Sequence, residues 1–152
     1  MKNLLEINDL KVTFPTDDGF VNAVDGVSLT VAPGETVAIV GESGSGKTVT
    51  SLSVIGLHNR KVTQLSGSIM VKDKDESLDI VSAPLDKIRS YRGRVVSMIF
   101  QDPMSSLHPY YKIGSQLAEA YLVHNPGKKE AANKKAIEML DLVGISEPQM
   151  RA

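Results

Sequence analysis

The chain has 152 residues, of which 41% are hydrophobic and 23% charged, a balance typical of a folded globular domain rather than a disordered segment. Seventeen basic residues against 18 acidic ones leave a net charge of −1, which provides no general basic field for nucleic acid or anionic lipid. The absence of cysteine excludes disulfides and a thiol nucleophile. No apolar run approaches the roughly 20 residues that cross a bilayer, so we expect a soluble chain with no nucleic-acid partner.

The N-terminal third predicts mostly antiparallel sheet. Short strands are expected over residues 4–14, 20–24 and 27–31. The first is broken near Asn8-Asp9 and stopped by Pro15, and Asp25-Gly26 is a favoured hairpin dipeptide. Residues 67–71 are expected to form an edge strand.

Two continuous apolar runs predict buried strands of one core sheet. These are residues 36–40 (TVAIV) and residues 95–100 (VVSMIF). The second run leads directly into Gln101, Asp102 and Pro103, and the proline forbids its continuation. Polar groups at such a strand end are typical of α/β binding sites.

Helices are expected in four places. Residues 49–57 are compatible with a helix, and Ser82 with Pro84 marks the start of a second, which Arg92-Gly93-Arg94 ends. Apolar residues at helical spacing predict two more, one over Ile113, Leu117 and Tyr121, the other over Ala136, Leu140 and Val143 with Gly144 as its cap.

Residues 41–48 (GESGSGKT) fit the phosphate-binding pattern G-x-x-x-x-G-K-[ST] and lie between a strand-like and a helix-like run. In such a loop the backbone N–H groups of about residues 44 to 48 face the phosphates, assisted by the positive end of the helix. Lys47 supplies a mobile charge for the β- and γ-phosphates, and the Thr48 hydroxyl can bind Mg²⁺. Nucleotide binding is therefore the first functional hypothesis.

Two other patterns are given plainer interpretations. Asp141 and Gly144 have the D-x-x-G spacing of GTPases, but they end a helix, and no N-K-x-D motif occurs. His58, His108 and His124 are scattered without a second ligand at metal-like spacing, so we expect surface or loop histidines and no metal site made of protein ligands alone.

Several stretches together carry a family resemblance. They are residues 10–15 (LKVTFP), 23–28 (AVDGVS), 41–48, 98–104 (MIFQDPM) and 106–109 (SLHP). Over nearly its whole length the sequence resembles the ATP-binding subunit of ABC transporters, most closely the oligopeptide/dipeptide importer group. His108 stands where that group usually has asparagine, a departure that we expect to be tolerated.

The resemblance implies an α/β fold: a P-loop NTPase core of the ABC ATPase type with an N-terminal antiparallel β subdomain, truncated within the helical subdomain. Residues 1–100 would form the nucleotide-binding core, and residues 101–152 the Q-loop and the incomplete helical subdomain. Residues 102–124 would face the coupling helix of a transmembrane subunit; a simple helical cap on the core is the alternative.

The resemblance also implies a site for ATP and Mg²⁺. Phe14 would stack on adenine; a core or strand-edge aromatic is the alternative. Gln101 would reach the Mg²⁺ and the attacking water; a solvated glutamine at a strand end is the alternative. Lys47 and Gln101 are the expected catalytic residues, and Thr48 and Gln101 the expected metal contacts. The expected nucleotide contacts are Phe14, Gly41, Ser43, Gly44, Ser45, Gly46, Lys47, Thr48 and Val49.

The family's later motifs, namely the L-S-G-G-Q signature, the Walker B Asp, the catalytic Glu and the switch His, do not occur in these residues. We therefore expect this fragment to bind ATP without appreciable hydrolysis. In the full protein the resemblance implies ATP hydrolysis that powers peptide uptake, at the cytoplasmic face of the membrane. The implied partners are transmembrane permease subunits, a second identical or different ATP-binding subunit and, indirectly, a solute-binding protein. Another cargo, or a nucleotide-binding fragment without turnover, remains open.

Overall fold

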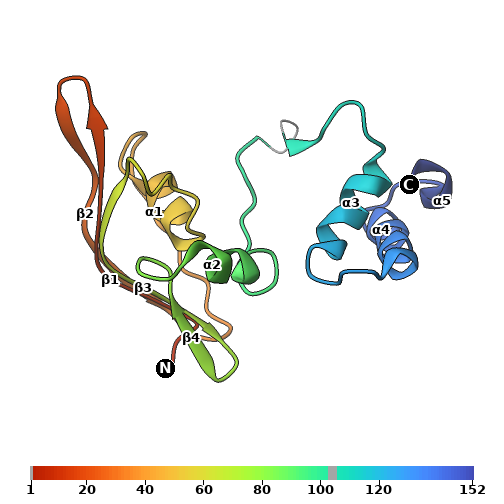
Figure 1. The fold of residues 1–152 in the computed structure, drawn as a ribbon, viewed down its shortest axis with the longest axis horizontal. Helices are drawn as coiled ribbons and strands as arrows, with labels where there is room; N and C mark the ends of the chain where they lie inside the picture. Colours follow the sequence, from red (N-terminus) through yellow and green to blue (C-terminus); the bar gives the residue numbers. More distant parts are fainter. Residues whose placement is uncertain (1, 103–105) are drawn as a thin grey trace. The chain divides into compact units, whose positions relative to one another are not determined.

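The computed structural model describes residues 2–102 and 106–152 and divides the chain into two compact units, residues 1–98 and 99–152 (Figure 1). The expected boundary at residue 100 lies two residues beyond this division. Pro103 and Met104, which belong to the motif of residues 98–104, lie outside the described residues. Among the described helices, none combines the length and the apolar character needed to cross a membrane.

The first unit is built on a four-stranded antiparallel sheet in the order β2-β1-β3-β4. The strands are β1 (Leu5–Thr16), β2 (Gly19–Val31), β3 (Gln64–Asp73) and β4 (Glu76–Asp79). The antiparallel start is confirmed, but two details were wrong. Pro15 does not stop the ladder, because pairing continues to Thr16 opposite Gly19. The run expected as an edge strand is part of β3, which pairs with β1 and with β4.

A bulge runs across the sheet where the sequence suggested strand breaks. Asp9 has a φ of 44°, and the register of β1 against both neighbours shifts there. Gly26 is the extra residue of β2 and is not a hairpin turn, since Asp25 pairs with Lys11 and Val27 with Leu10. The bulge keeps each strand continuous while it changes which residues face the core: Ile7 is buried before it, and Leu10 after it.

Two helices cover one face of this sheet, α1 (Lys47–Val54) and α2 (Leu85–Tyr91) (Figure 1). The fully buried side chains of Ile7, Leu10 and Ile69 from the strands form the core with Ile88 of α2. Val49 and Val54 of α1 pack against the same cluster. The helices expected after the phosphate loop and from Pro84 are therefore confirmed.

The two apolar runs expected as core strands are not strands. Residues 36–40 and most of residues 95–100 have no ladder partner in the described chain; the exception is an isolated parallel bridge between Arg92 and Val96. Val40 is 91% exposed, and Ile99 is 93% exposed. An apolar run forms a buried strand only where neighbouring strands satisfy its backbone groups, and none is paired with these runs.

Both runs nevertheless reach the same place in the first unit. A pocket of about 280 Å³ is lined by Val37 and Ile39 of one run and by residues 96–98 of the other. The sheet contributes Ile7 and Leu29, among others, and α1 contributes Val54. Part of each run thus lies at the sheet and α1 although neither run forms a strand, whereas Val40 and Ile99 are exposed.

The second unit contains α3 (Ile113–Leu122), α4 (Lys129–Leu142) and the short α5 (Pro148–Arg151). The first two match the predicted helices, and Gly144 follows α4 with a φ of 78° as the expected cap. Ala118 of α3 packs against Ala132 and Ala136 of α4. Small side chains at this contact allow the two helices to approach closely.

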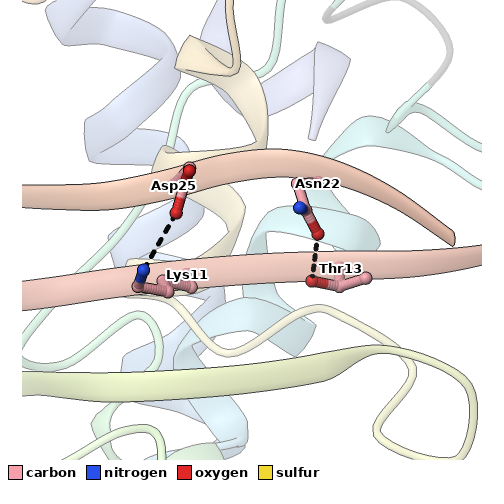
Figure 2. A network of polar contacts seen from close by, with 4 residues as sticks. All are labelled: Lys11, Thr13, Asn22 and Asp25. Atoms are coloured by element: carbon pink, nitrogen blue, oxygen red, sulfur yellow. Dashed lines mark hydrogen bonds and ion pairs between the residues drawn. The ribbon is translucent and has the colours of Figure 1, made fainter.

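A second bulge, on the edge strand β2, positions the phosphate loop. Val24 pairs with Val12 and Asn22 with Thr13, which leaves Ala23 as an extra residue between them. Polar pairs between β1 and β2 flank this bulge (Figure 2): Lys11 Nζ donates to Asp25 at 3.0 Å, and the Thr13 hydroxyl donates to Asn22 at 2.9 Å. The Asp25 carboxylate raises the pKa of Lys11 above its usual value.

The phosphate loop lies against this bulge. Gly46 has a φ of 88°, and a Cβ added there would lie 2.5 Å from the Ala23 carbonyl oxygen of β2 and 3.5 Å from Val24. The backbone at position 46 is thus both left-handed and in close contact with a strand. Only glycine satisfies both requirements at once.

Comparing two glycines of the loop tests this contact. Gly44 also has a positive φ, of 82°, but an added Cβ would meet nothing within 4 Å. We expect Gly44→Ala to cost about 1–2 kcal/mol through backbone strain alone. Gly46→Ala should cost a further roughly 1–3 kcal/mol, because the Ala23 carbonyl must move. Urea unfolding of both variants measures the difference, and equal losses of stability would contradict the docking of the loop on β2.

Candidate phosphate-binding site

Lys47, the first residue of α1, folds back over its own loop. Its Nζ donates hydrogen bonds to the carbonyl oxygens of Gly41 at 2.8 Å and Glu42 at 2.7 Å, and to Ser45 Oγ at 3.2 Å. All three protons of the ammonium group therefore have acceptors within the loop. The positive charge of Lys47 therefore lies within the loop and is bonded only to neutral acceptors. An anionic ligand bound in the loop would compete with these acceptors for the ammonium group.

The glycines allow the loop to curl this tightly. A Cβ at Gly41 would lie 2.6 Å from Ser45 Oγ, so the Ser45 side chain lies close against the start of the loop. Ser45 N–H donates to Glu42 O at 3.2 Å, which closes a turn across the loop. One of the amides expected to face phosphate is thus already engaged within the loop.

The start of α1 adds further donors. The first backbone N–H groups of a helix have no intrahelical partner, and no side chain caps them here. Uncapped amides and the helix dipole both favour an anion at this end. The Thr48 residue is exposed, and its side chain forms no hydrogen bond within the described residues. The Val49 side chain packs toward the core, so only its backbone N–H could contact a ligand.

The hydroxyl groups of α1 are largely used inside the helix. Thr50 Oγ1 donates to Gly46 O at 3.0 Å, Ser51 Oγ to Lys47 O at 3.1 Å, and Ser53 Oγ to Val49 O at 2.8 Å. These bonds satisfy side chains that would otherwise be polar groups near the core. Thr48, the predicted metal contact, is the exception among the hydroxyls that follow the lysine.

The far end of α1 is held by arginine. Arg92 Nε donates to the Ile55 carbonyl at 2.8 Å, and Arg92 Nη2 donates to the Gly56 carbonyl. A cation at a helix C-terminus interacts favourably with the helix dipole. Burial, with Arg89 and Arg60 nearby, lowers the pKa of Arg92, but a guanidinium group stays charged at neutral pH. The helix is thus fixed at one end by the Gly46 contact and at the other by Arg92.

Phe14, the predicted adenine platform, lies on β1 opposite Val21 and is half-buried. It packs against the edge of the core cluster, as the core-aromatic alternative requires, yet part of the ring stays accessible. One neighbour is His58, whose ring meets Phe14 edge-on with the centroids 5.6 Å apart. The expectation that His58 is an ordinary loop histidine missed this contact.

The predicted site residues are divided between the two units. Phe14 and residues 41–49 belong to the first unit, in which β1, β2 and α1 pack around one core. Gln101 belongs to the second unit and is exposed. Ser43 is exposed at the tip of the loop. The phosphate-binding and base-binding candidates thus share one packed body, while the role of Gln101 stays a prediction.

Gln116 of α3 is a structural residue that the sequence did not reveal. Its Oε1 accepts from His108 N–H at 2.8 Å, and its Nε2 donates to the carbonyls of His108 at 3.0 Å and Tyr111 at 2.9 Å. His108 Nδ1 accepts from Tyr110 N–H at 3.3 Å, an interaction that an asparagine side chain can also make. Gln116 contacts the backbone rather than the side chain at position 108, so these hydrogen bonds do not require a particular residue type there, and the tolerance of histidine stays a prediction.

A triphosphate fits the donor set of the first unit. The loop offers one ammonium group, uncapped amides at a helix N-terminus and an exposed hydroxyl. No cluster of three or more His, Cys, Asp or Glu side chains suited to a metal occurs in residues 2–102 and 106–152. A Mg²⁺ ion would therefore rely on phosphate oxygens and water together with Thr48, which is the usual way that Mg²⁺ is bound with nucleotides.

Comparisons with known proteins agree with this geometry. The chain is 47% identical, over its whole length and 24% of the relative, to the oligopeptide transport ATP-binding protein OppD of Mycobacterium bovis. It is 46% identical to the dipeptide transport ATP-binding protein DppD of Bacillus subtilis, over 99% of the chain and 44% of the relative. The chain thus spans less than half of the length of these relatives, 24% of the first and 44% of the second.

Solved structures show the same fold at lower identity. The dimeric ATP-binding cassette MJ0796, described as bound to ADP and Pi, matches with a TM-score of 0.74 and 19% identity, over 94% of this chain and 58% of the cassette. A second dimeric structure of MJ0796 matches with a TM-score of 0.77 and 20% identity. The α/β fold predicted from the sequence is therefore that of an ABC ATPase cassette.

Residues 24–152 match the family described as ABC transporter, and this match covers more than half of the chain. The chain belongs to the ABC transporter family.

Proposed function

We propose that this chain is the ATP-binding part of an ABC importer ATPase that powers the uptake of oligopeptides or dipeptides. The observation that carries the ATP-binding part of the proposal is the position of Lys47, whose ammonium group lies within 2.7–3.2 Å of three acceptors of its own loop at the N-terminus of α1. When a nucleotide binds, the Lys47 ammonium group would replace these neutral acceptors with phosphate oxygens. Charge-assisted hydrogen bonds of this kind are roughly twice as strong as neutral ones.

The predicted site residues have separate roles in this proposal. The amides of residues 44–48 and Lys47 hold the β- and γ-phosphates, and Phe14 provides an apolar face for the adenine ring. Bound Mg²⁺ would neutralise charge on the phosphates, with the Thr48 hydroxyl as a protein ligand. Gln101 would reach the Mg²⁺ and the attacking water. These assignments follow the family motif and are compatible with the exposure of Thr48 and Gln101.

The proposed cargo and partners are inferred from the names and descriptions of the relatives. OppD and DppD are named as oligopeptide and dipeptide transport proteins, and the MJ0796 cassettes are described as dimers. We propose that this chain acts at the cytoplasmic face of a membrane with permease subunits and a second ATP-binding subunit, and indirectly with a solute-binding protein. An importer of another cargo would share the same nucleotide site.

Isothermal titration of the chain with MgATP tests the nucleotide site. We expect binding that Lys47→Ala weakens by roughly 10- to 150-fold, since a hydrogen bond to a charged group contributes about 1.5–3 kcal/mol. Lys61→Ala is the control, because Lys61 is an exposed lysine of the first unit that lies outside the loop. Equal effects of the two substitutions, or no binding by the unaltered chain, would refute the proposal.

We further propose that these residues alone bind ATP without turning it over. The described groups that contact Lys47 are two carbonyl oxygens and one hydroxyl, none of them a carboxylate that could orient or deprotonate water. Phosphoryl transfer to water needs such a group as well as a positioned nucleotide. Neither the signature motif nor the acidic pair of the family occurs in the 152 residues.

Phosphate release measured over hours with saturating MgATP distinguishes a binding module from an enzyme. We expect the rate to equal that of Lys47→Ala, close to the background without protein. The same preparation must bind ATP by titration, so that a zero rate cannot be attributed to misfolding. Steady release well above background that Lys47→Ala abolishes would show that this chain is itself a complete hydrolase.

A further inference from the structure

His58 connects the phosphate-loop helix to the predicted base platform. Its Nε2 lies 3.0 Å from the Val49 carbonyl and 2.9 Å from Ser53 Oγ, both on α1. A carbonyl oxygen only accepts hydrogen bonds, so Nε2 must carry the proton. Ser53 is fully buried and donates its own proton to Val49 O, which leaves Ser53 Oγ as a second acceptor for His58.

The same imidazole supports Phe14. The two rings meet at an interplanar angle of 70° with the centroids 5.6 Å apart, an edge-to-face arrangement that aromatic pairs prefer. Phe14 belongs to β1, and the Val49 anchor lies one residue beyond the phosphate loop. A single half-buried side chain thus links a strand aromatic to the first turns of α1.

This link matters because the length of a nucleotide limits the distance between its bound phosphates and its bound base. Its phosphates bind at the start of α1, so the aromatic face that receives the base must lie at a set distance from that helix. β1 and α1 both pack on the common core, but His58 adds a directed contact between Phe14 and Val49. Loss of that contact would leave the phosphate loop intact and release the ring.

We propose that His58 is a positioning residue that holds Phe14 in place for the purine base and thereby sets affinity for the base rather than for the phosphates. The inference rests on the proposed function, since it requires that Phe14 stacks on a nucleotide. His58 itself touches no nucleotide in this account.

Two variants separate the two contacts. His58→Gln keeps an N–H donor for Val49 but loses the ring, whereas His58→Phe keeps a ring for Phe14 but loses the donor. The ligands are MgATP and inorganic tripolyphosphate with Mg²⁺, which presents phosphates without a base. His124→Gln is the matched control, because His124 is a half-buried histidine of the second unit.

We expect each His58 variant to weaken ATP binding by about three- to tenfold, the range of an aromatic contact, and to leave tripolyphosphate binding within about twofold. His124→Gln should change neither. In a Phe14→Ala background His58→Gln should have no further effect on ATP, because the ring that it positions is gone. Thermal unfolding of every variant is measured in parallel to verify that it is folded.

The contrary outcomes are distinct. His58 variants that weaken ATP and tripolyphosphate equally, that change neither, or that still weaken ATP in the Phe14→Ala background overturn this inference alone. An unaltered chain that binds neither ligand overturns the proposed function and this inference with it. If His58→Phe fails to fold, the His58→Gln comparison with the two ligands decides the matter.

Discussion

The close contact between the phosphate loop and the edge strand β2 governs the geometry of the first unit. The Gly46 backbone approaches the Ala23 carbonyl so closely that an added Cβ would lie 2.5 Å from it, and Ala23 is itself the bulged residue of β2. The strand is held on both sides of the bulge by polar pairs with β1. The loop is thus built against the antiparallel sheet, and α1 begins where that contact ends. Lys47 is the next residue in the chain, so the contact at Gly46 sets the position of its backbone.

The other parts of the candidate site are positioned relative to this contact. α1 is fixed at its start by Gly46 and at its end by Arg92, so its first-turn amides have a defined position on the sheet. Phe14 reaches the same helix through His58. The phosphate and base candidates are therefore positioned by one helix and two neighbouring strands. The candidate phosphate and base contacts of the first unit all lie within the first 58 positions.

The sequence could predict the features that depend on local pattern. The phosphate loop, α1, the helices from Leu85, Ile113 and Lys129 and the turn at Gly144 all follow from spacing, glycine placement or helical periodicity. It could not predict features that depend on distant partners. Residues 36–40 are apolar enough for a core strand, but strand formation needs paired neighbours. Gln116 and His58 look like solvated or loop side chains until folding brings backbone carbonyls within reach.

The central claim is that residues 44–48 and Lys47 form a phosphate site positioned by β2. Amide chemical shifts of ¹⁵N-labelled chain during titration with MgATP test it most directly, because they report on each backbone N–H separately. The account predicts saturable shifts that are largest at residues 44–48, with smaller shifts at Ala23 and Phe14, and clearly reduced shifts at these positions in Lys47→Ala at the same ATP concentration. Saturable shifts confined to the second unit, or none in the loop, would contradict it.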